Sequence, residues 1–317
     1  MSKYLGVEIG GTKQQIVVGN AEGEILLRES VKLSYKRGAE DILDWIREKT
    51  EYLLSEYSDT EAIGVGFGGP LESATGRVLC SLQVPGWKDF KLKEWFEQTF
   101  GKRTVVVNDT VAGGIAELRL GAGRGSRRLF YTNIGTGIGG GLYIDGTYYD
   151  GSGTGASYLG NSLIPDRTSD EPGKAVRLEL ICSGRSIENR LNTEGYVPES
   201  SLLFEKIKAG QRIDASDLGE AARKKDSFAL AELKMTAESF SIGLANVLAL
   251  EGPDRIVIGG GVAKMGDILF DAIRKYTDEY AFVAHKGRYE IYPSELMDDA
   301  VPAGSLLVAA GFLTEGI

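Results

Sequence analysis

The sequence is poor in the residues that hold structural zinc or build disulfide frameworks. Among its 317 residues there is one histidine, His285, and two cysteines, Cys80 and Cys182. A zinc site rich in cysteine and histidine takes four ligands, so these three residues cannot complete one. The two cysteines lie far apart and indicate reduced structural thiols. The composition therefore predicts a protein that binds no zinc and has no disulfide framework.

Basic charge and long apolar runs are also scarce. The net charge is −9, and the arginines of GRGSRRL at 123–129 are interpreted as solvated loop residues. A polyanion such as nucleic acid is therefore not an expected partner. No apolar run approaches the roughly 20 residues that cross a bilayer. Because a strand pattern begins at residues 3–5, there is no room for a signal segment. We expect a cytoplasmic protein with no membrane partner.

Glycine is abundant, with 43 residues, and the excess falls at the ends of strand-like runs. This placement indicates sites where backbone segments approach closely. The chain length favours two domains. The residue patterns predict strands at 3–8, 14–19 and 24–33, a helix at 39–57 and a buried strand at 62–68. They then predict a helix at 91–100, a strand at 104–109 and a helix at 111–120.

The second part of the chain repeats the first hairpin. A shift of 125 positions places LGVEIGGTKQQIVVGNAEG over FYTNIGTGIGGGLYIDGTY, with an isoleucine and glycine before each turn. An internal repeat of this size predicts duplicated architecture. The later sequence predicts mainly helix over 181–251, a strand that ends in three glycines and leads into a helix, a strand near 289–292 and a helix over 302–314.

The glycine turns have two interpretations. They lack the spacing of the P-loop and of dinucleotide sites. Each could be a tight hairpin turn that needs positive φ. Alternatively, two such turns could direct backbone N–H groups at an anion, with hydroxyls of Thr12 and Thr136 as further donors. The third glycine run, before a predicted helix, favours the second interpretation.

Four motifs in this order resemble the ROK family of sugar kinases and repressors, within the actin and hexokinase superfamily. They are GGTK at 10–13, Asn108-Asp109, GTGIGGG at 135–141 and IVIGGGV at 256–262. The resemblance implies a two-lobed α/β fold of the actin-like ATPase (ribonuclease H-like) type with duplicated glycine-hairpin sheet units. The small lobe would comprise 1–110 and 301–317, and the large lobe 111–300.

The activity implied by the resemblance is transfer of the γ-phosphoryl group of ATP, with Mg²⁺, to a hydroxyl of a sugar or polyol. Asp109 would be the general base; its alternative role is the N-cap of the following helix. Asn108 would bind sugar hydroxyls, or be a satisfied turn amide. Glu8 would hold Mg²⁺ directly or through water, or be a solvent-facing charge. The phosphates would be bound by Gly10, Gly11, Thr12, Lys13, Gly135, Thr136, Gly137, Gly259, Gly260 and Gly261, with Lys13 equally interpretable as solvent-facing.

The sequence departs from the family pattern near the acceptor. A G-E-x-G-H segment is replaced by Ser157-Tyr158-Leu159-Gly160-Asn161, and the zinc motif is replaced by EPGKAVRLELICSGRSI, in which Glu179 remains. We expect Tyr158, Asn161 and Glu179 to contact the acceptor. Because buried hydrogen-bonding groups set sugar specificity, the acceptor is predicted to be altered, and zinc is predicted to be absent.

A second hypothesis is a sugar- or nucleotide-binding regulatory protein of the same fold with weak turnover. Family repressors carry an extra N-terminal DNA-binding module, whereas this sequence begins in the first predicted strand. A DNA-binding repressor is therefore not expected. The retained Asn108-Asp109 and the three glycine segments favour the enzyme, whereas the replaced glutamate and histidine favour the binding protein. The resemblance also implies, by analogy, a homodimer.

Overall fold

The computed structural model describes residues 2–32, 37–81 and 84–312. Its backbone contacts divide the chain into two compact units. The first comprises Met1–Ser126, Gly141–Ala156 and Glu295–Ile317, and the second comprises Arg127–Gly140 and Ser157–Ser294. These bounds differ from those of the predicted lobes. Because contacts do not show which parts move as one body, the division into lobes stays a prediction.

The first unit contains a five-stranded sheet with the order β3-β2-β1-β4-β8. Its strands are β1 (Lys3–Ile9), β2 (Lys13–Gly19), β3 (Ile25–Lys32), β4 (Thr60–Phe67) and β8 (Arg103–Asn108). The first three run antiparallel, whereas β4 is parallel to both β1 and β8. Ile9 pairs with Phe67, and Phe67 pairs with Asn108. The carboxyl ends of three parallel strands therefore meet at one edge of this sheet.

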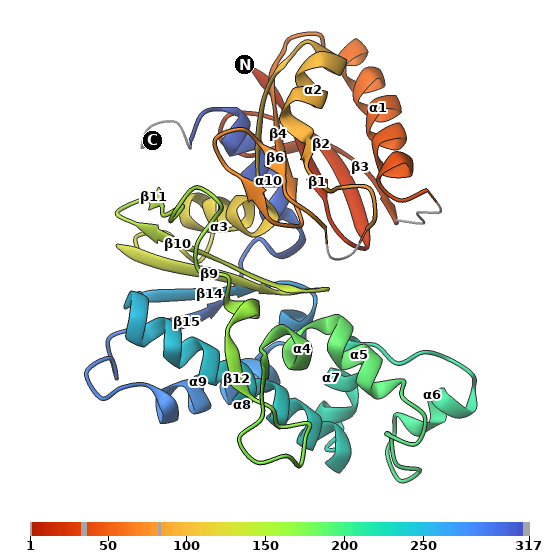
Figure 1. Cartoon of the computed structure of the whole chain (residues 1–317), viewed down its shortest axis with the longest axis vertical. Helices are drawn as coiled ribbons and strands as arrows, with labels where there is room; N and C mark the ends of the chain where they lie inside the picture. The colour runs from red at the N-terminus through yellow and green to blue at the C-terminus, as the bar shows by residue number, and fades with distance from the viewer. Residues whose placement is uncertain (1, 33–36, 82–83, 313–317) are drawn as a thin grey trace. The chain divides into compact units, whose positions relative to one another are not determined.

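Helices cover both faces of this sheet (Figure 1). Helices α1 (Ala39–Glu56) and α2 (Leu92–Phe100) pack on β2 and β8, while α10 (Ala300–Ala309) packs on β1 and β4 and against α3 (Asp109–Leu120). Alternate residues of each strand face opposite sides. The predicted helices form with slightly shifted ends. The final helix was expected over 302–314, but α10 already ends at Ala309. Positions 313–314 lie outside the described residues.

Glycines inside β4 and α10 allow α10 to lie directly on the sheet. A Cβ at Gly64 would lie 1.9 Å from the Ser305 carbonyl oxygen. A Cβ at Gly304 would lie 1.8 Å from the Ala112 carbonyl oxygen. Neither contact leaves room for a methyl group, so α10, β4 and α3 pack through their backbones.

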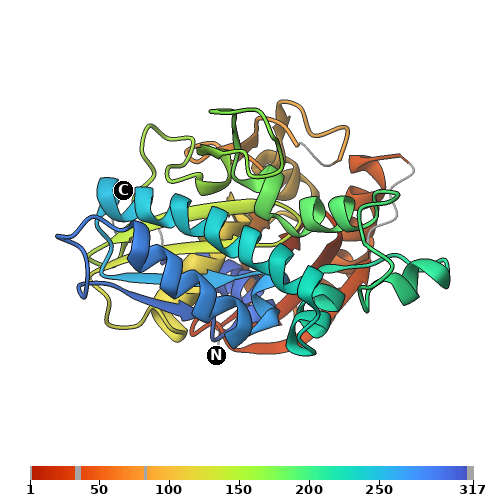
Figure 2. The same ribbon diagram turned by 90° about the horizontal axis from the view of Figure 1, so that it is seen from below.

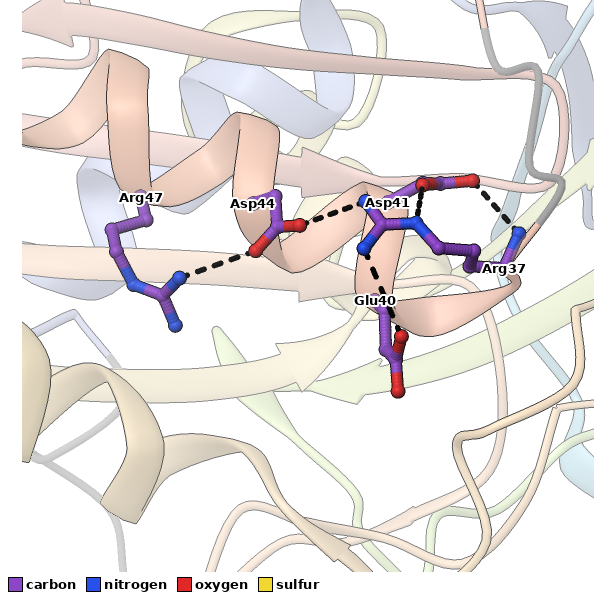
Figure 3. A network of polar contacts seen from close by, with 5 residues as sticks. All are labelled: Arg37, Glu40, Asp41, Asp44 and Arg47. Atoms are coloured by element: carbon purple, nitrogen blue, oxygen red, sulfur yellow. Dashed lines mark hydrogen bonds and ion pairs between the residues drawn. The ribbon is translucent and has the colours of Figure 1, made fainter.

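Polar contacts define the start of α1 (Figure 3). Its N-cap is Gly38, which has no side chain to cap the helix. Instead, Asp41 accepts a hydrogen bond from the backbone N–H of Arg37 and forms an ion pair with the same residue at 2.7 Å. Glu40 and Asp44 also pair with Arg37. Because these side chains are largely exposed, we expect the ion pairs to orient the start of α1 and to contribute little to the free energy of unfolding.

A second sheet has the order β11-β10-β9-β14-β15. Its strands are β9 (Arg128–Ile134), β10 (Ile138–Ile144), β11 (Thr147–Tyr148), β14 (Arg255–Gly259) and β15 (Glu290–Pro293). Strand β14 runs parallel to β9 and β15, as β4 runs parallel to β1 and β8. The order of strands along the chain is the same in both sheets. This correspondence confirms the predicted duplication.

Besides β9, β14 and β15, the second unit consists mainly of helices. Its core is formed by side chains such as Phe130, Phe240 and Phe270. In the described part of this unit the two longest helices, α8 (Ser227–Glu251) and α9 (Asp267–Tyr280), run side by side (Figure 2). The shorter elements are η1 (Leu159–Asn161), α4 (Glu179–Cys182), α5 (Gly184–Leu191), α6 (Phe204–Lys208), α7 (Ala215–Arg223) and η2 (Val262–Met265).

Several short elements were not expected from the sequence. They are the strands β5 (Leu71–Glu72), β6 (Arg77–Val78), β7 (Phe90–Lys91), β12 (Leu163–Pro165) and β13 (Ala175–Arg177), and the 3-10 turn η3 (Met297–Asp299). Across the described residues, every helix is too short or too polar to cross a membrane.

Candidate active site

Two acidic residues, Glu8 and Asp109 (the acidic pair), and several glycines lie at the carboxyl edge of the first sheet. Glu8 lies near the end of β1, and Asp109 directly follows β8. Between them is Gly68, whose N–H donates to the Ile9 carbonyl at 2.8 Å. A Cβ at Gly68 would lie 3.2 Å from Asp109 Oδ2 and 3.6 Å from the Cα of Gly10. The first glycine turn and the Asp109 carboxylate are therefore neighbours across a glycine.

Asp109 is the first residue of α3, and it is not the helix cap. The N-cap is Asn108, whose side chain accepts from the Thr110 N–H at 2.9 Å. The alternative interpretation of Asp109 as the N-cap is therefore wrong. Asp109 Oδ1 accepts from the same N–H at 2.7 Å and from the Thr110 hydroxyl at 3.3 Å. These bonds orient the carboxylate and leave Oδ2 beside Gly68.

Burial and a neighbouring charge make Asp109 unusually basic for a carboxylate. Burial raises the pKa of Asp109 to about 7, and the negative charge of Glu8 adds to this effect. The hydrogen bonds from Thr110 act in the opposite direction. Burial also raises the pKa of Glu8, although the charge of Lys13 and a hydrogen bond from Gln15 oppose the shift. Lys13 therefore acts electrostatically on the site.

The acidic pair fits a magnesium ion. Mg²⁺ takes oxygen ligands, and it is usually bound by one or two protein carboxylates together with waters and substrate phosphates. Glu8 and Asp109 supply two carboxylates that repel each other unless a cation or a proton lies near them. Within the described ranges, no three histidine, cysteine, aspartate or glutamate residues form a group able to hold a metal. Two carboxylates are therefore suited to a Mg²⁺ ion whose other ligands are substrate phosphates and water.

The glycine turns do not need positive φ. None of Gly10, Gly11, Gly135 or Gly137 has a positive φ, so the turn interpretation that required it is wrong. The first turn is closed by a hydrogen bond from the Gly10 N–H to the Lys13 carbonyl at 3.2 Å. A Cβ at Gly135 would meet only the Gly137 oxygen, at 3.9 Å. The absence of side chains here leaves open space next to the backbone.

The second unit brings the other two glycine segments together. Gly260 has a φ of 89°, and a Cβ there would lie 2.6 Å from the backbone of Ile134, which precedes the turn at Gly135. The N–H of Gly184, at the start of α5, donates to the Gly135 carbonyl at 2.7 Å. The third glycine run was expected to lead directly into a helix. Instead, the 3-10 turn η2 follows it, and α9 begins only after Gly266.

Two of the four predicted acceptor residues, Asn108 and Glu179, make local side-chain contacts in the structure. Asn108 Nδ2 donates to the Gly69 carbonyl at 3.0 Å, so its amide is bonded within the turn, as the alternative interpretation proposed. Glu179 Oε2 accepts from the Ile138 N–H at 3.3 Å and thereby holds the second glycine hairpin. Tyr158 is half-buried before η1, and Asn161 is exposed at its end. Contact of these four residues with an acceptor stays a prediction.

Comparison with known proteins places the chain in a family. The model of the ROK family matches residues 4–311. This chain belongs to the ROK family. It is 30% identical to a glucokinase of Thermotoga maritima, over 99% of this chain and 98% of the relative. It is 27% identical to a putative xylose repressor of a Caldicellulosiruptor species, over 95% of this chain and 76% of the relative.

A solved ROK structure agrees with the fold. The glucokinase of Streptomyces griseus, determined in complex with glucose and AMPPNP, superposes with a TM-score of 0.82 at 26% identity. The match covers 97% of this chain and 99% of the other. The ROK resemblance and the predicted α/β class are therefore confirmed.

The ROK chain has residues at the site that sequence reasoning did not identify. Gln15 and Gly68 border the acidic pair in the first unit, and Asn133 and Gly184 hold the second glycine hairpin. The repeat offered one signal, because a shift of 125 places Asn133 at the position of Glu8. The predicted sites fall in both units, so convergence of the glycine turns on one nucleotide stays a prediction.

Proposed function

We propose that this ROK chain is an ATP-dependent kinase that phosphorylates a hydroxyl of a sugar or sugar-like molecule, with Asp109 as general base. The observation that carries the proposal is the acidic pair at the carboxyl edge of the first sheet. There the pKa of Asp109 is raised to about 7. A base is most effective when its pKa lies near the working pH, and an ordinary aspartate is too weak for this task.

Each group at the site is assigned one role in phosphoryl transfer. Mg²⁺ would neutralise charge on the phosphates, and Glu8 would hold it directly or through water. Asp109 would accept the proton of the attacking hydroxyl through Oδ2, since Thr110 bonds to Oδ1. The backbone of the glycine turns would bind phosphate oxygens, with Lys13 adding positive charge. This assignment is supported by the relatives named glucokinases and by the AMPPNP complex of one of them.

We further propose an acceptor other than glucose and a site that needs no zinc. Tyr158 and Asn161 stand where the family pattern has glutamate and histidine. A tyrosine and an amide present different donors and acceptors, and a mismatch at a buried hydroxyl lowers catalytic efficiency strongly. Selective phosphorylation of glucose at a high rate would overturn this part of the proposal.

The second candidate is a regulatory protein that binds sugar or nucleotide with little turnover. Two observations favour it: the similarity to a repressor extends over 95% of this chain, and the Asn108 amide is already bonded within its turn. Assembly as a homodimer is a separate proposal, which light scattering would test.

A coupled assay of ADP release separates the two candidates. Hexoses, amino sugars, ketoses and polyols are tested with Mg²⁺ and ATP, and each active acceptor is retested with polyphosphate as donor. We expect at least one acceptor to raise ADP production well above the rate with ATP alone. If none does while calorimetry shows that ATP binds, the regulatory function is supported and the kinase is not.

A further inference from the structure

Gln15 is a buried polar residue beside the candidate site that the proposed chemistry does not use. It lies on β2 directly opposite Glu8, and only 1% of its surface is exposed. Its Nε2 donates a hydrogen bond to Glu8 Oε2. Its Oε1 is buried and has no hydrogen-bond partner within the described part of the chain. The side chain is therefore bound to Glu8 through one end only.

The surroundings of Gln15 do not favour a glutamine for packing alone. The neighbouring residue on the same face of β2 is Val17, which packs with Tyr4 and Leu306 in an apolar cluster. A buried amide oxygen without a partner costs stability, whereas an apolar side chain of similar length would not. Stability alone would thus favour an apolar residue at position 15. We therefore look to the hydrogen bond with Glu8 for the reason that an amide stands at this position.

The two oxygens of Glu8 point to different neighbours. Oε2 is held by Gln15, whereas a Cβ at Gly10 would lie 3.8 Å from Oε1. Oε1 therefore faces the first glycine turn, where phosphates are proposed to bind. A glutamate has one more rotatable bond than an aspartate, so its carboxylate needs a contact that fixes its direction.

We propose that Gln15 is a positioning residue, which holds one oxygen of Glu8 so that the other is directed at the ion of the metal–nucleotide complex. This inference rests on the proposed function of Glu8. Residues that orient a metal-binding carboxylate affect metal affinity without touching the ion, and their loss typically lowers affinity or activity about 10–100-fold.

The test measures ion binding directly. Mn²⁺ replaces Mg²⁺, and its binding in the presence of ADP is followed by electron paramagnetic resonance. Gln15→Met keeps the length of the side chain and removes the donor. We expect the dissociation constant of Mn²⁺ to rise about tenfold. In turnover, kcat should fall and the Mg²⁺ concentration that gives half-maximal activity should rise, while KM for the sugar stays within about twofold of the native value.

Gln14→Met is the matched control. Gln14 is the preceding residue of the same strand, is also 1% exposed and also has an unpartnered Oε1. It pairs with Ile9, so strand alternation directs it to the opposite face from Glu8. Gln14→Met should leave Mn²⁺ binding within about twofold of the native value. Equal losses in both variants would indicate a general effect of disturbing β2 and would overturn the proposal.

A double variant tests whether Gln15 acts through Glu8. In a Glu8→Gln background, Gln15→Met should cause no further loss of Mn²⁺ binding. An additional tenfold loss would contradict the inference. If Gln15→Met does not fold, Gln15→Asn withdraws the amide by one carbon and should weaken binding in the same direction. Mn²⁺ binding requires no acceptor, so a native protein that binds the ion but phosphorylates nothing would refute the kinase and leave this inference standing.

Discussion

The carboxylate of Glu8 acts electrostatically on that of Asp109, and its negative charge helps to raise the pKa of Asp109 to about 7. The two side chains come from strands that are not adjacent, since β4 lies between β1 and β8. Their proximity follows from parallel strands that end at the same edge. One carboxylate thereby tunes the basicity of the other, and an ion bound near them would alter both.

This relationship predicts the acidic limb of the pH profile. A general base works only when deprotonated, so kcat/KM for the sugar should fall on the acidic side, with a midpoint of about 7 that bound Mg²⁺ shifts to lower pH. In Glu8→Gln the negative charge is gone, and the limb should move to lower pH. Both profiles are measured at saturating ATP and Mg²⁺. A native profile that stays flat down to pH 5 would show that Asp109 does not limit the reaction.

Two adjacent glycines give a matched test of the third glycine run. A Cβ at Gly260 would meet the backbone of Ile134 at 2.6 Å, and its φ of 89° is unfavourable for other residues. Gly261 has a φ of −62° and nothing within 4 Å of its Cβ position. We expect Gly260→Ala to lower the free energy of unfolding by roughly 2–4 kcal/mol and Gly261→Ala by less than about 1 kcal/mol.

Urea denaturation of both variants measures these changes. Similar losses in the two variants would contradict the close approach of Gly260 to Ile134. Binding of a fluorescent ATP analogue then separates the role of Gly261 in the fold from its proposed role with phosphate.

The sequence predicted the strands, the larger helices and the duplicated sheet because their apolar periodicity and glycine ends are local signals. It also placed Asp109 at the last position of a strand, whereas β8 ends one residue earlier and Asp109 begins α3. It did not reveal that Asn108 caps α3 or that Gln15 meets Glu8, since those contacts depend on three-dimensional register. The short strands β12 and β13 were also missed, because three residues carry too little periodicity to be recognised.

From the contacts of the segment that stands in place of the family's zinc motif, we expect removal of zinc to leave the activity unchanged. The hairpin of β12 and β13 is followed by Cys182, which is buried and whose thiol pKa burial raises. Arg167, in the loop between the two strands, pairs with Glu238 at 2.8 Å, and Glu238 also accepts from the Tyr280 hydroxyl. These contacts tie the loop to α8 and α9 through protein side chains.

We expect protein treated with a chelator and then dialysed to regain full activity when Mg²⁺ alone is added. Arg167→Met should increase proteolysis of the loop between β12 and β13, and Arg47→Met, which removes an exposed pair on α1, is the control. Recovery of activity only after addition of Zn²⁺ would contradict the prediction.

The central claim is that Asp109 is the base of a sugar kinase, and steady-state kinetics of Asp109→Asn with the best acceptor test it most directly. The amide keeps the size of the side chain but cannot accept the proton. Asp59→Asn, which alters an exposed aspartate paired with Lys3, is the matched control. At pH 8 the fold disfavours charged Asp109, since its folded pKa is raised. Asp109→Asn should therefore be at least as stable to urea as the native protein. The account predicts a fall in kcat of about 10²–10⁴-fold with KM for ATP within about threefold, whereas a stable variant that retains kcat within tenfold would contradict it.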